Sequence, residues 1–172
     1  MSPSDQSSTL TISPATPEDV PALFDLVMAL ADYEKLTHEV TGSAEAMARH
    51  LFGDRPYAEA IVARVDSKPV GFALFFHNFS TFLMKPGIYL EDLFVLPTHR
   101  GQGIGKALLQ ALAKMAVERD CGRFEWSVLN WNEPAIAFYK KMGAQLRTEW
   151  ELCRVTGEAL QELAGLASPP ES

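Results

Sequence analysis

The fold of this chain is decided by the stretch Ile88-Tyr89-Leu90-Glu91-Asp92-Leu93-Phe94-Val95-Leu96-Pro97-Thr98-His99-Arg100-Gly101-Gln102-Gly103-Ile104-Gly105-Lys106. Its first half is apolar apart from two acids and is stopped by Pro97, which predicts a strand over 88–95. A glycine-rich turn over 100–106 follows, and apolar residues at helical spacing from 104 to 116 predict a helix. Glycines permit a tight turn and a helix start presents free N–H groups, so we expect a phosphate to bind here.

Two common phosphate-binding patterns do not fit the turn. A Walker A loop requires G-x-x-x-x-G-K-[ST], but Gly105-Lys106 is followed by Ala107, and Arg100 stands where the first glycine belongs. A dinucleotide fingerprint requires G-x-G-x-x-G after the first strand, whereas this G-x-G-x-G lies late in the chain. The turn therefore binds another phosphate-bearing ligand, or it is a glycine-rich turn without a ligand.

The elements around the turn follow from periodicity and capping residues. Helices are predicted from Thr16 to about Lys35, from Ser43 to Gly53, from Asn132 to Gly143 and over 157–166. Strands are predicted at 10–12, 58–65, 70–76, 123–128 and 146–155, with a loop over 78–87. Together with the central stretch, the order β-α-α-β-β-β-α-β-α-β predicts an α/β fold with a mixed sheet.

Composition narrows the classes of function. The chain has 172 residues and a formal net charge of −7, and we expect one domain over 9–166 between tails at 1–8 and 167–172. An acidic balance without a basic stripe argues against nucleic-acid binding, and no apolar run is long enough to span a membrane. The two cysteines form no CxxC pair and the four histidines lack metal-ligand spacing, so we expect no metal. A cytoplasmic location is expected because no signal-peptide pattern begins the chain.

The motifs resemble those of one enzyme superfamily. The element Arg100-x-x-Gly103-x-Gly105 resembles the acetyl-CoA pyrophosphate loop of the GNAT N-acetyltransferases. With Tyr89–Val95, Asn132–Ala144 and Leu30–Glu34, it resembles the spermidine/spermine and thialysine N-acetyltransferase branch. The resemblance implies a GNAT fold, in which a mixed, mostly antiparallel sheet flanked by helices splays between its fourth and fifth strands.

The resemblance also implies acetyl-CoA as the cofactor that donates the acetyl group. Its pantetheine arm would pair with the backbone in the splay, and an amide near Val95 would stabilise the oxyanion. The residues implied in cofactor binding are Leu93, Phe94, Val95, Arg100, Gly101, Gln102, Gly103, Ile104, Gly105, Lys106, Asn132, Glu133, Pro134, Ala135 and Tyr139.

Two proton transfers define the implied catalytic residues. An alkylammonium must lose a proton before it attacks, and Glu91 is placed to take it, directly or through water. Tyr139 matches the family's general acid, which protonates the leaving thiolate. Substrate contacts are implied for Tyr33, Glu34, Glu91, Asp92, Glu125, Trp126 and Ser127.

Each of these roles has a structural alternative. Adjacent strand residues face opposite sides, so only one of Glu91 and Asp92 is expected to turn outward to solvent. Tyr139 has core-like helical spacing, and Tyr33 and Glu34 also suit a solvated helix end.

The implied function is transfer of acetyl from acetyl-CoA to a primary amine of a small polyamine or diamino acid, by direct attack. Lys85 or Arg154 is placed to meet the carboxylate of a diamino acid. A non-catalytic acyl-CoA-binding module and an acetyltransferase for protein amines remain as alternatives. Relatives of this branch are homodimers, and the apolar segment 146–155 suits a shared interface.

Overall fold

The computed structural model describes residues 8–166 and divides the chain into two units, Met1–Ser127 and Val128–Ser172. Each unit is described by itself. Except for Ser8, the predicted tails at 1–8 and 167–172 lie outside the described residues.

The first unit is built on a five-stranded mixed sheet. Its strands are β1 (Leu10–Pro14), β2 (Glu59–Val65), β3 (Lys68–Ser80), β4 (Lys85–Val95) and β5 (Arg123–Trp126). They lie in sequence order, with antiparallel pairing up to β4 and parallel pairing between β4 and β5. The predicted mixed, mostly antiparallel sheet is confirmed.

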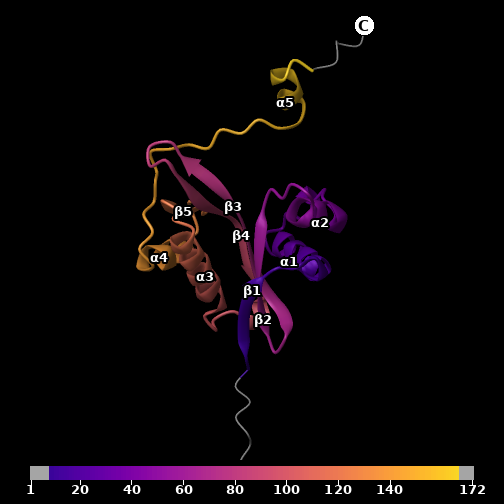
Figure 1. The fold of residues 1–172 in the computed structure, drawn as a ribbon, viewed down its shortest axis with the longest axis vertical. Helices are drawn as coiled ribbons and strands as arrows, with labels where there is room; N and C mark the ends of the chain where they lie inside the picture. The colour runs from indigo at the N-terminus through magenta and orange to yellow at the C-terminus, as the bar shows by residue number, and fades with distance from the viewer. Residues whose placement is uncertain (1–7, 167–172) are drawn as a thin grey trace, which may run out of the picture. The chain divides into compact units, whose positions relative to one another are not determined.

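Helices cover both faces of this sheet (Figure 1). One face carries α1 (Val20–Tyr33), after the short η1 (Pro17–Asp19), and α2 (Ala44–Phe52), which η2 (Thr37–Glu39) precedes. The other face carries α3 (Ile104–Glu118), which follows η3 (Pro97–His99). On the first face Leu23, Leu26 and Leu51 of the helices pack with Phe72 of β3 and Phe94 of β4.

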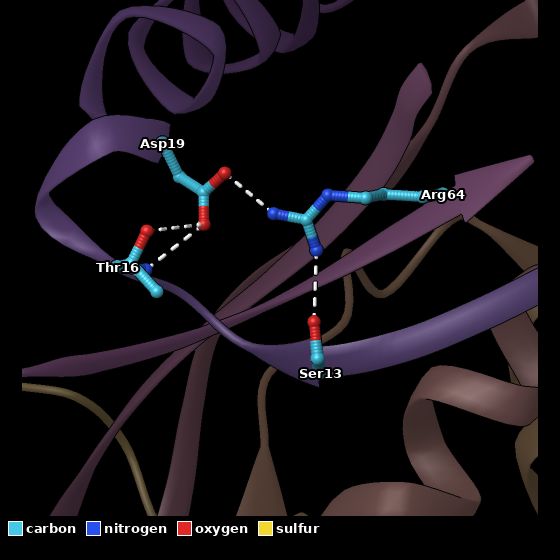
Figure 2. Close-up of polar contacts among 4 residues, drawn as sticks. All are labelled: Ser13, Thr16, Asp19 and Arg64. Carbon is cyan, nitrogen blue, oxygen red and sulfur yellow. Dashed lines mark hydrogen bonds and ion pairs between the residues drawn. The ribbon is translucent and has the colours of Figure 1, made fainter. Parts of the chain in front are cut away.

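The start of α1 is anchored to the sheet by a polar cluster (Figure 2). The Asp19 carboxylate accepts hydrogen bonds from the backbone N–H of Thr16 at 2.9 Å and from Arg64 Nη2 at 2.5 Å. The second Nη of Arg64 donates to Ser13 Oγ at 2.8 Å. The predicted cap at Thr16 is thereby confirmed, and it is tied to β1 and β2.

A β-bulge interrupts the pairing of β3 with β4 at the two acids. Leu74 faces Asp92 and Phe75 faces Leu90, so Glu91 is the extra residue. The pairing of β4 with β5 ends at Leu90 and Trp126, while β4 continues to Val95. Beyond Leu90, the edge of β4 that faces away from β3 therefore has no strand partner among the described residues, as a splayed sheet requires.

Two sequence predictions were wrong. The predicted loop over 78–87 is largely strand, because β3 and β4 pair out to Ser80 and Lys85 and leave only a four-residue tip, 81–84. Cross-strand pairing outweighs the weak local β-propensity of Asn78 and Pro86. The predicted last strand over 146–155 is coil, because no strand of the described chain pairs with it.

The second unit contains α4 (Glu133–Lys141) and α5 (Gly157–Leu163). Asn132 caps α4 as predicted, since its Oδ1 accepts a hydrogen bond from the N–H of Ala135 at 3.3 Å. Several large apolar side chains of this unit are exposed to solvent, among them Trp150, Leu152 and Leu163.

Candidate active site

Three carboxylates act on one another where α1 ends above β4. The pKa of Asp92 is raised to about 6, first by burial and then by the negative charges of Glu91 and Glu34. Glu34 caps the C-terminal end of α1, and Asp92 faces Leu74 of β3, which packs on the core beneath α1. The structure therefore brings together three of the predicted substrate residues from two elements far apart in sequence.

The bulge explains how both adjacent acids contribute to this cluster. Leu74 and Phe75 are neighbours in β3 and point to opposite faces, so their partners Asp92 and Leu90 also point to opposite faces. In a regular strand, two residues two positions apart would share a face. The expectation that only one of Glu91 and Asp92 turns outward to solvent is confirmed, although the extra residue Glu91 interrupts the regular alternation of the strand. Glu91 itself is exposed, whereas Asp92 is partly buried.

An arginine holds the end of α1 beside the cluster. The guanidinium of Arg100 lies 4.2 Å from the ring centre of Tyr33 and 5.4 Å from that of Phe94. Its Nε donates a hydrogen bond to the carbonyl oxygen of Val95 at 3.0 Å. Arg100 was predicted to bind the cofactor, and its contact with Tyr33 had no signal in the local sequence.

The glycine-rich turn is shaped to receive an anion. Gly101 and Gly103 have φ of 76° and 78°, a left-handed conformation that favours glycine, and Gly103 is the N-cap of α3. No side chain caps α3 and its first turn holds no acid, so the first N–H groups of the helix are available to a ligand. At Gly105 a Cβ would lie 3.7 Å from Leu93 of β4, so this glycine sits directly on the strand.

The unpaired edge of β4 offers backbone groups beside this turn. The N–H of Leu96 donates to the carbonyl of Val70 in β3 at 2.8 Å, so the Val95 carbonyl, in the same peptide, points to the open edge. By the alternation of an antiparallel ladder, the N–H groups of Leu93 and Val95 point there too. The Phe94 carbonyl instead lies against Gly71 of β3. Of the three predicted backbone contacts, Leu93 and Val95 are therefore the two that face the gap.

The predicted residues of β5 take part in a polar network with β3 and β4. Glu125 Oε1 accepts a hydrogen bond from Asn78 Nδ2 at 3.3 Å and forms an ion pair with Arg123, whose Nε lies 3.0 Å away. Ser127 Oγ and the Tyr89 hydroxyl are 2.7 Å apart. Tyr89 was not predicted as a site residue, although it begins the motif that contains Glu91. Trp126 packs against the ring of Phe124, with centroids 4.9 Å apart.

Lys85 is not placed to meet a substrate carboxylate. Its Nζ donates to Asp120 Oδ1 at 2.6 Å, which ties the start of β4 to the turn after α3. The suggestion that Lys85 recognises a diamino acid was therefore wrong, because Asp120 already supplies its counter-charge. Arg154 lies in the exposed coil of the second unit.

In the second unit, the other predicted residues gather on one short helix. Glu133 and Pro134 form the exposed first turn of α4, and Asn132 and Ala135 form its cap. Burial raises the pKa of the Tyr139 phenol above its usual value. Tyr139 therefore carries its proton at neutral pH, as a proton donor to a thiolate must.

Two other predictions concern metals and membranes. Among residues 8–166, no three His, Cys, Asp or Glu side chains are grouped to hold a metal ion. Within the same residues, no helix is long and apolar enough to cross a membrane.

Comparison with known proteins gives a consistent picture. Residues 27–144 match the family model described as "Acetyltransferase (GNAT) family". The chain is 36% identical to L-ornithine N5-acetyltransferase NATA1 of Arabidopsis thaliana, over 87% of this chain and 85% of that protein. It is 37% identical to thialysine N-epsilon-acetyltransferase of Mus musculus, over 90% of this chain and 96% of that protein. A Vibrio cholerae integron cassette protein of known structure superposes with a TM-score of 0.77 at 30% identity, covering 90% of this chain and 97% of that one.

These matches confirm the predicted resemblance, the GNAT fold and the use of acetyl-CoA as acetyl donor. They also remove the alternative of a non-catalytic binding module, since the relatives are acetyltransferases along most of their length. The chain belongs to the GNAT family and is an acetyl-CoA-dependent N-acetyltransferase.

Proposed function

We propose that this enzyme acetylates a primary amine of a small diamino acid or polyamine, by direct attack of the amine on acetyl-CoA. The observation that carries this proposal is the carboxylate cluster of Glu34, Glu91 and Asp92. Two of its three carboxylates, Glu91 and Asp92, lie on β4, the strand whose free edge suits an acyl-pantetheine arm. A cationic amine would be attracted to the cluster and brought beside the thioester.

The described residues fit acetyl-CoA in two ways. The pyrophosphate suits the glycine-rich turn and the uncapped N-terminus of α3, with the exposed Lys106 adding a positive charge. The pantetheine arm suits the open edge of β4 at Leu93 and Val95, by strand addition. The N–H of Val95 would then donate to the thioester oxygen and stabilise the charge that develops there. Bound acetyl-CoA supplies the activated acetyl group.

The proton from the ammonium is assigned to the pair of acids in the bulge. Glu91 was predicted as the base, and its exposure suits proton transfer through water. The pKa of Asp92, about 6, suits a base, since a base works best when its pKa lies near the operating pH. We therefore propose that Asp92 shares this role with Glu91, and that Tyr139 returns a proton to the thiolate.

The substrate class follows from charge and from the relatives. The names of the two relatives specify L-ornithine and thialysine, each of which has two amines and one carboxylate. An anionic cluster suits a substrate with an ammonium group, and a second ammonium would strengthen binding. We propose a small diamino acid as the first substrate to test, ahead of polyamines.

We also propose that the enzyme is a cytoplasmic homodimer. The support for a dimer is the segment 144–156, which exposes Trp150, Leu152 and Val155 without a strand partner in the described chain. β5 is the last strand of the described sheet, so its outer edge can accept a strand from a second copy. Sedimentation velocity should give twice the 19.0 kDa chain mass, and a monomer that remains active would contradict the proposal. The support for the cytoplasm is two unpaired cysteines, Cys121 and Cys153.

The decisive experiment measures coenzyme A release from acetyl-CoA with thialysine, ornithine, lysine, spermidine, putrescine and a lysine-containing peptide. The wild type is compared with Glu91→Gln, Asp92→Asn and Tyr139→Phe, and with Glu118→Gln as a control on the exposed side of α3. We expect turnover of a diamino acid, retained by the control and lost mainly in kcat by the other three. Turnover of the peptide alone would replace the small-molecule proposal with a protein substrate.

A further inference from the structure

A cation–π contact links the cofactor strand to the amine site. Arg100 stands at the start of the glycine-rich turn, yet its side chain extends to the end of α1 rather than into the turn. Its guanidinium lies over the Tyr33 ring at 4.2 Å, and its Nε donates to the Val95 carbonyl at 3.0 Å. The same side chain therefore touches a residue of the amine site and a residue of the cofactor edge.

We propose that Arg100 is a positioning residue of the amine site, holding Tyr33 and the end of α1 over the carboxylate cluster. This inference rests on the proposed function, because it assigns Tyr33 and its neighbour Glu34 to the amine. It differs from the role implied by the motif, in which Arg100 binds the cofactor directly.

The environment of Tyr33 explains why the end of α1 needs the contact with Arg100, which we call the Arg100 clamp. Tyr33 is the last residue of α1 and is 61% exposed, and its ring meets Phe94 at a centroid distance of 6.4 Å. Lys35, two residues later, has a left-handed φ of 59°, which ends the helix. The end of a helix frays unless something packs on it. Arg100 packs on the Tyr33 ring. Because its guanidinium is planar, it can stack on the ring while its Nε donates the hydrogen bond to the Val95 carbonyl.

The Val95 hydrogen bond gives the clamp a link to the cofactor. The Val95 carbonyl points to the open edge of β4, where the pantetheine arm is proposed to lie. A cofactor that orders this edge would also order Arg100, and through it Tyr33. We therefore expect bound acetyl-CoA to reduce the mobility of the end of α1 and to raise the affinity of the enzyme for the amine.

Steady-state kinetics with two matched cations tests the assignment. Lys106 belongs to the same turn and is exposed, and the described cation–π contact on Tyr33 is made by Arg100. We expect Arg100→Met and Tyr33→Ala each to raise the KM for the amine about three- to ten-fold, with the KM for acetyl-CoA changed less than about two-fold. Lys106→Met should do the reverse, raising the KM for acetyl-CoA alone. Arg100→Lys, which keeps the charge but not the planar stack, should restore only part of the loss.

The double variant excludes a merely structural effect. If Arg100 acts through Tyr33, Arg100→Met combined with Tyr33→Ala should raise the amine KM no more than either change alone. Additive effects, or a loss of acetyl-CoA affinity with an unchanged amine KM, would overturn the proposal.

Hydrogen exchange separates this inference from the proposed function. The N–H groups of Glu34 and Leu36 are bonded to Leu30 and Ala31 at 2.9 and 2.8 Å. Coenzyme A should slow their exchange in the wild type and in Lys106→Met, but not in Arg100→Met. If no amine in the panel is turned over, the proposed substrate class is wrong, but the exchange measurement still tests whether Arg100 orders the end of α1. Equal protection in all three proteins would overturn it.

Discussion

Asp19 and Asp92 are both partly buried aspartates of the first unit, and their surroundings shift their pKa values in opposite directions. Burial alone would raise the pKa of Asp19, but hydrogen bonds from Arg64 and Thr16 and the charge of Arg64 bring it below its usual value. At Asp92 burial acts in the same direction, and the charges of Glu91 and Glu34 add to it, so the pKa rises to about 6. One carboxylate is fully compensated and the other is not.

This difference separates a structural acid from the acid that we propose to be reactive. The Asp19 cluster fixes the entry of α1 and joins it to β1 and β2 (Figure 2). The Asp92 cluster lies where α1 ends. Its carboxylates repel one another, and the cationic amine that we propose to bind there would relieve this repulsion. Strain of this kind gathers at functional sites, and the rest of the fold must offset it.

Breaking the compensated pair should have the largest effect on stability. The side chains of Arg64 and Asp19 are only 19% and 13% exposed, so Arg64→Met leaves a carboxylate without its partner. We expect a loss of about 2–3 kcal/mol in the free energy of unfolding, measured by urea denaturation. The control is Lys114→Met, which breaks the exposed pair with Glu118 and should change stability by less than about 0.5 kcal/mol. Equal effects would show that the cluster is not the anchor described here.

Neutralising Asp92 should raise the free energy of unfolding, the opposite of the effect expected for Arg64→Met. Asp92→Asn removes a buried charge whose pKa lies at about 6, so we expect the unfolding free energy at pH 8 to rise by about 2 kcal/mol. The same change should lower kcat about 100-fold, because a proton acceptor is lost. A variant that is both less stable and fully active would contradict the assignment of Asp92.

The pH dependence of stability should show the two signs separately. Asp92 has a raised pKa, so its contribution is fully present below about pH 4 and is lost as the pH rises through about 6. Asp19 has a lowered pKa, so its contribution is present above about pH 4 and is lost as the pH falls through its folded pKa. Urea titrations from pH 3 to 8 should therefore show the wild type losing stability relative to Asp92→Asn mainly between about pH 4 and 6. No change in that interval would contradict the burial of Asp92.

We expect the smallest change in stability from a substitution of Glu91, the exposed neighbour of Asp92. Glu91→Gln should alter stability by less than about 0.5 kcal/mol, because Glu91 is exposed. It removes one of the charges that raise the pKa of Asp92, so the acidic limb of the kcat/KM profile should move to lower pH. A limb that disappears altogether would identify Glu91, rather than Asp92, as the titrating base.

Much of the first unit was predictable because its signals are local. The caps at Thr16 and Ser43, the glycines before α3 and the periodic apolar residues of α1 and α3 all act within a few residues. Strand pairing needs remote partners, and there the predictions were weaker. The hairpin of β3 and β4 is longer than expected, and the segment 146–155 lacks the neighbour that would make it a strand.

The candidate site divides in the same way. By itself, the amino-acid sequence determined the glycine-rich turn, the helix behind it and the acidic pair in β4, because turn chemistry and periodicity are properties of adjacent residues. Only the tertiary structure decided that Glu91 occupies a bulge, that Lys85 is taken by Asp120 and that Arg100 stacks on Tyr33. Those outcomes depend on strand register and on which elements pack together. The burial of Asp92 and its closeness to the charge of Glu34, which raise its pKa, likewise arise only when the chain folds.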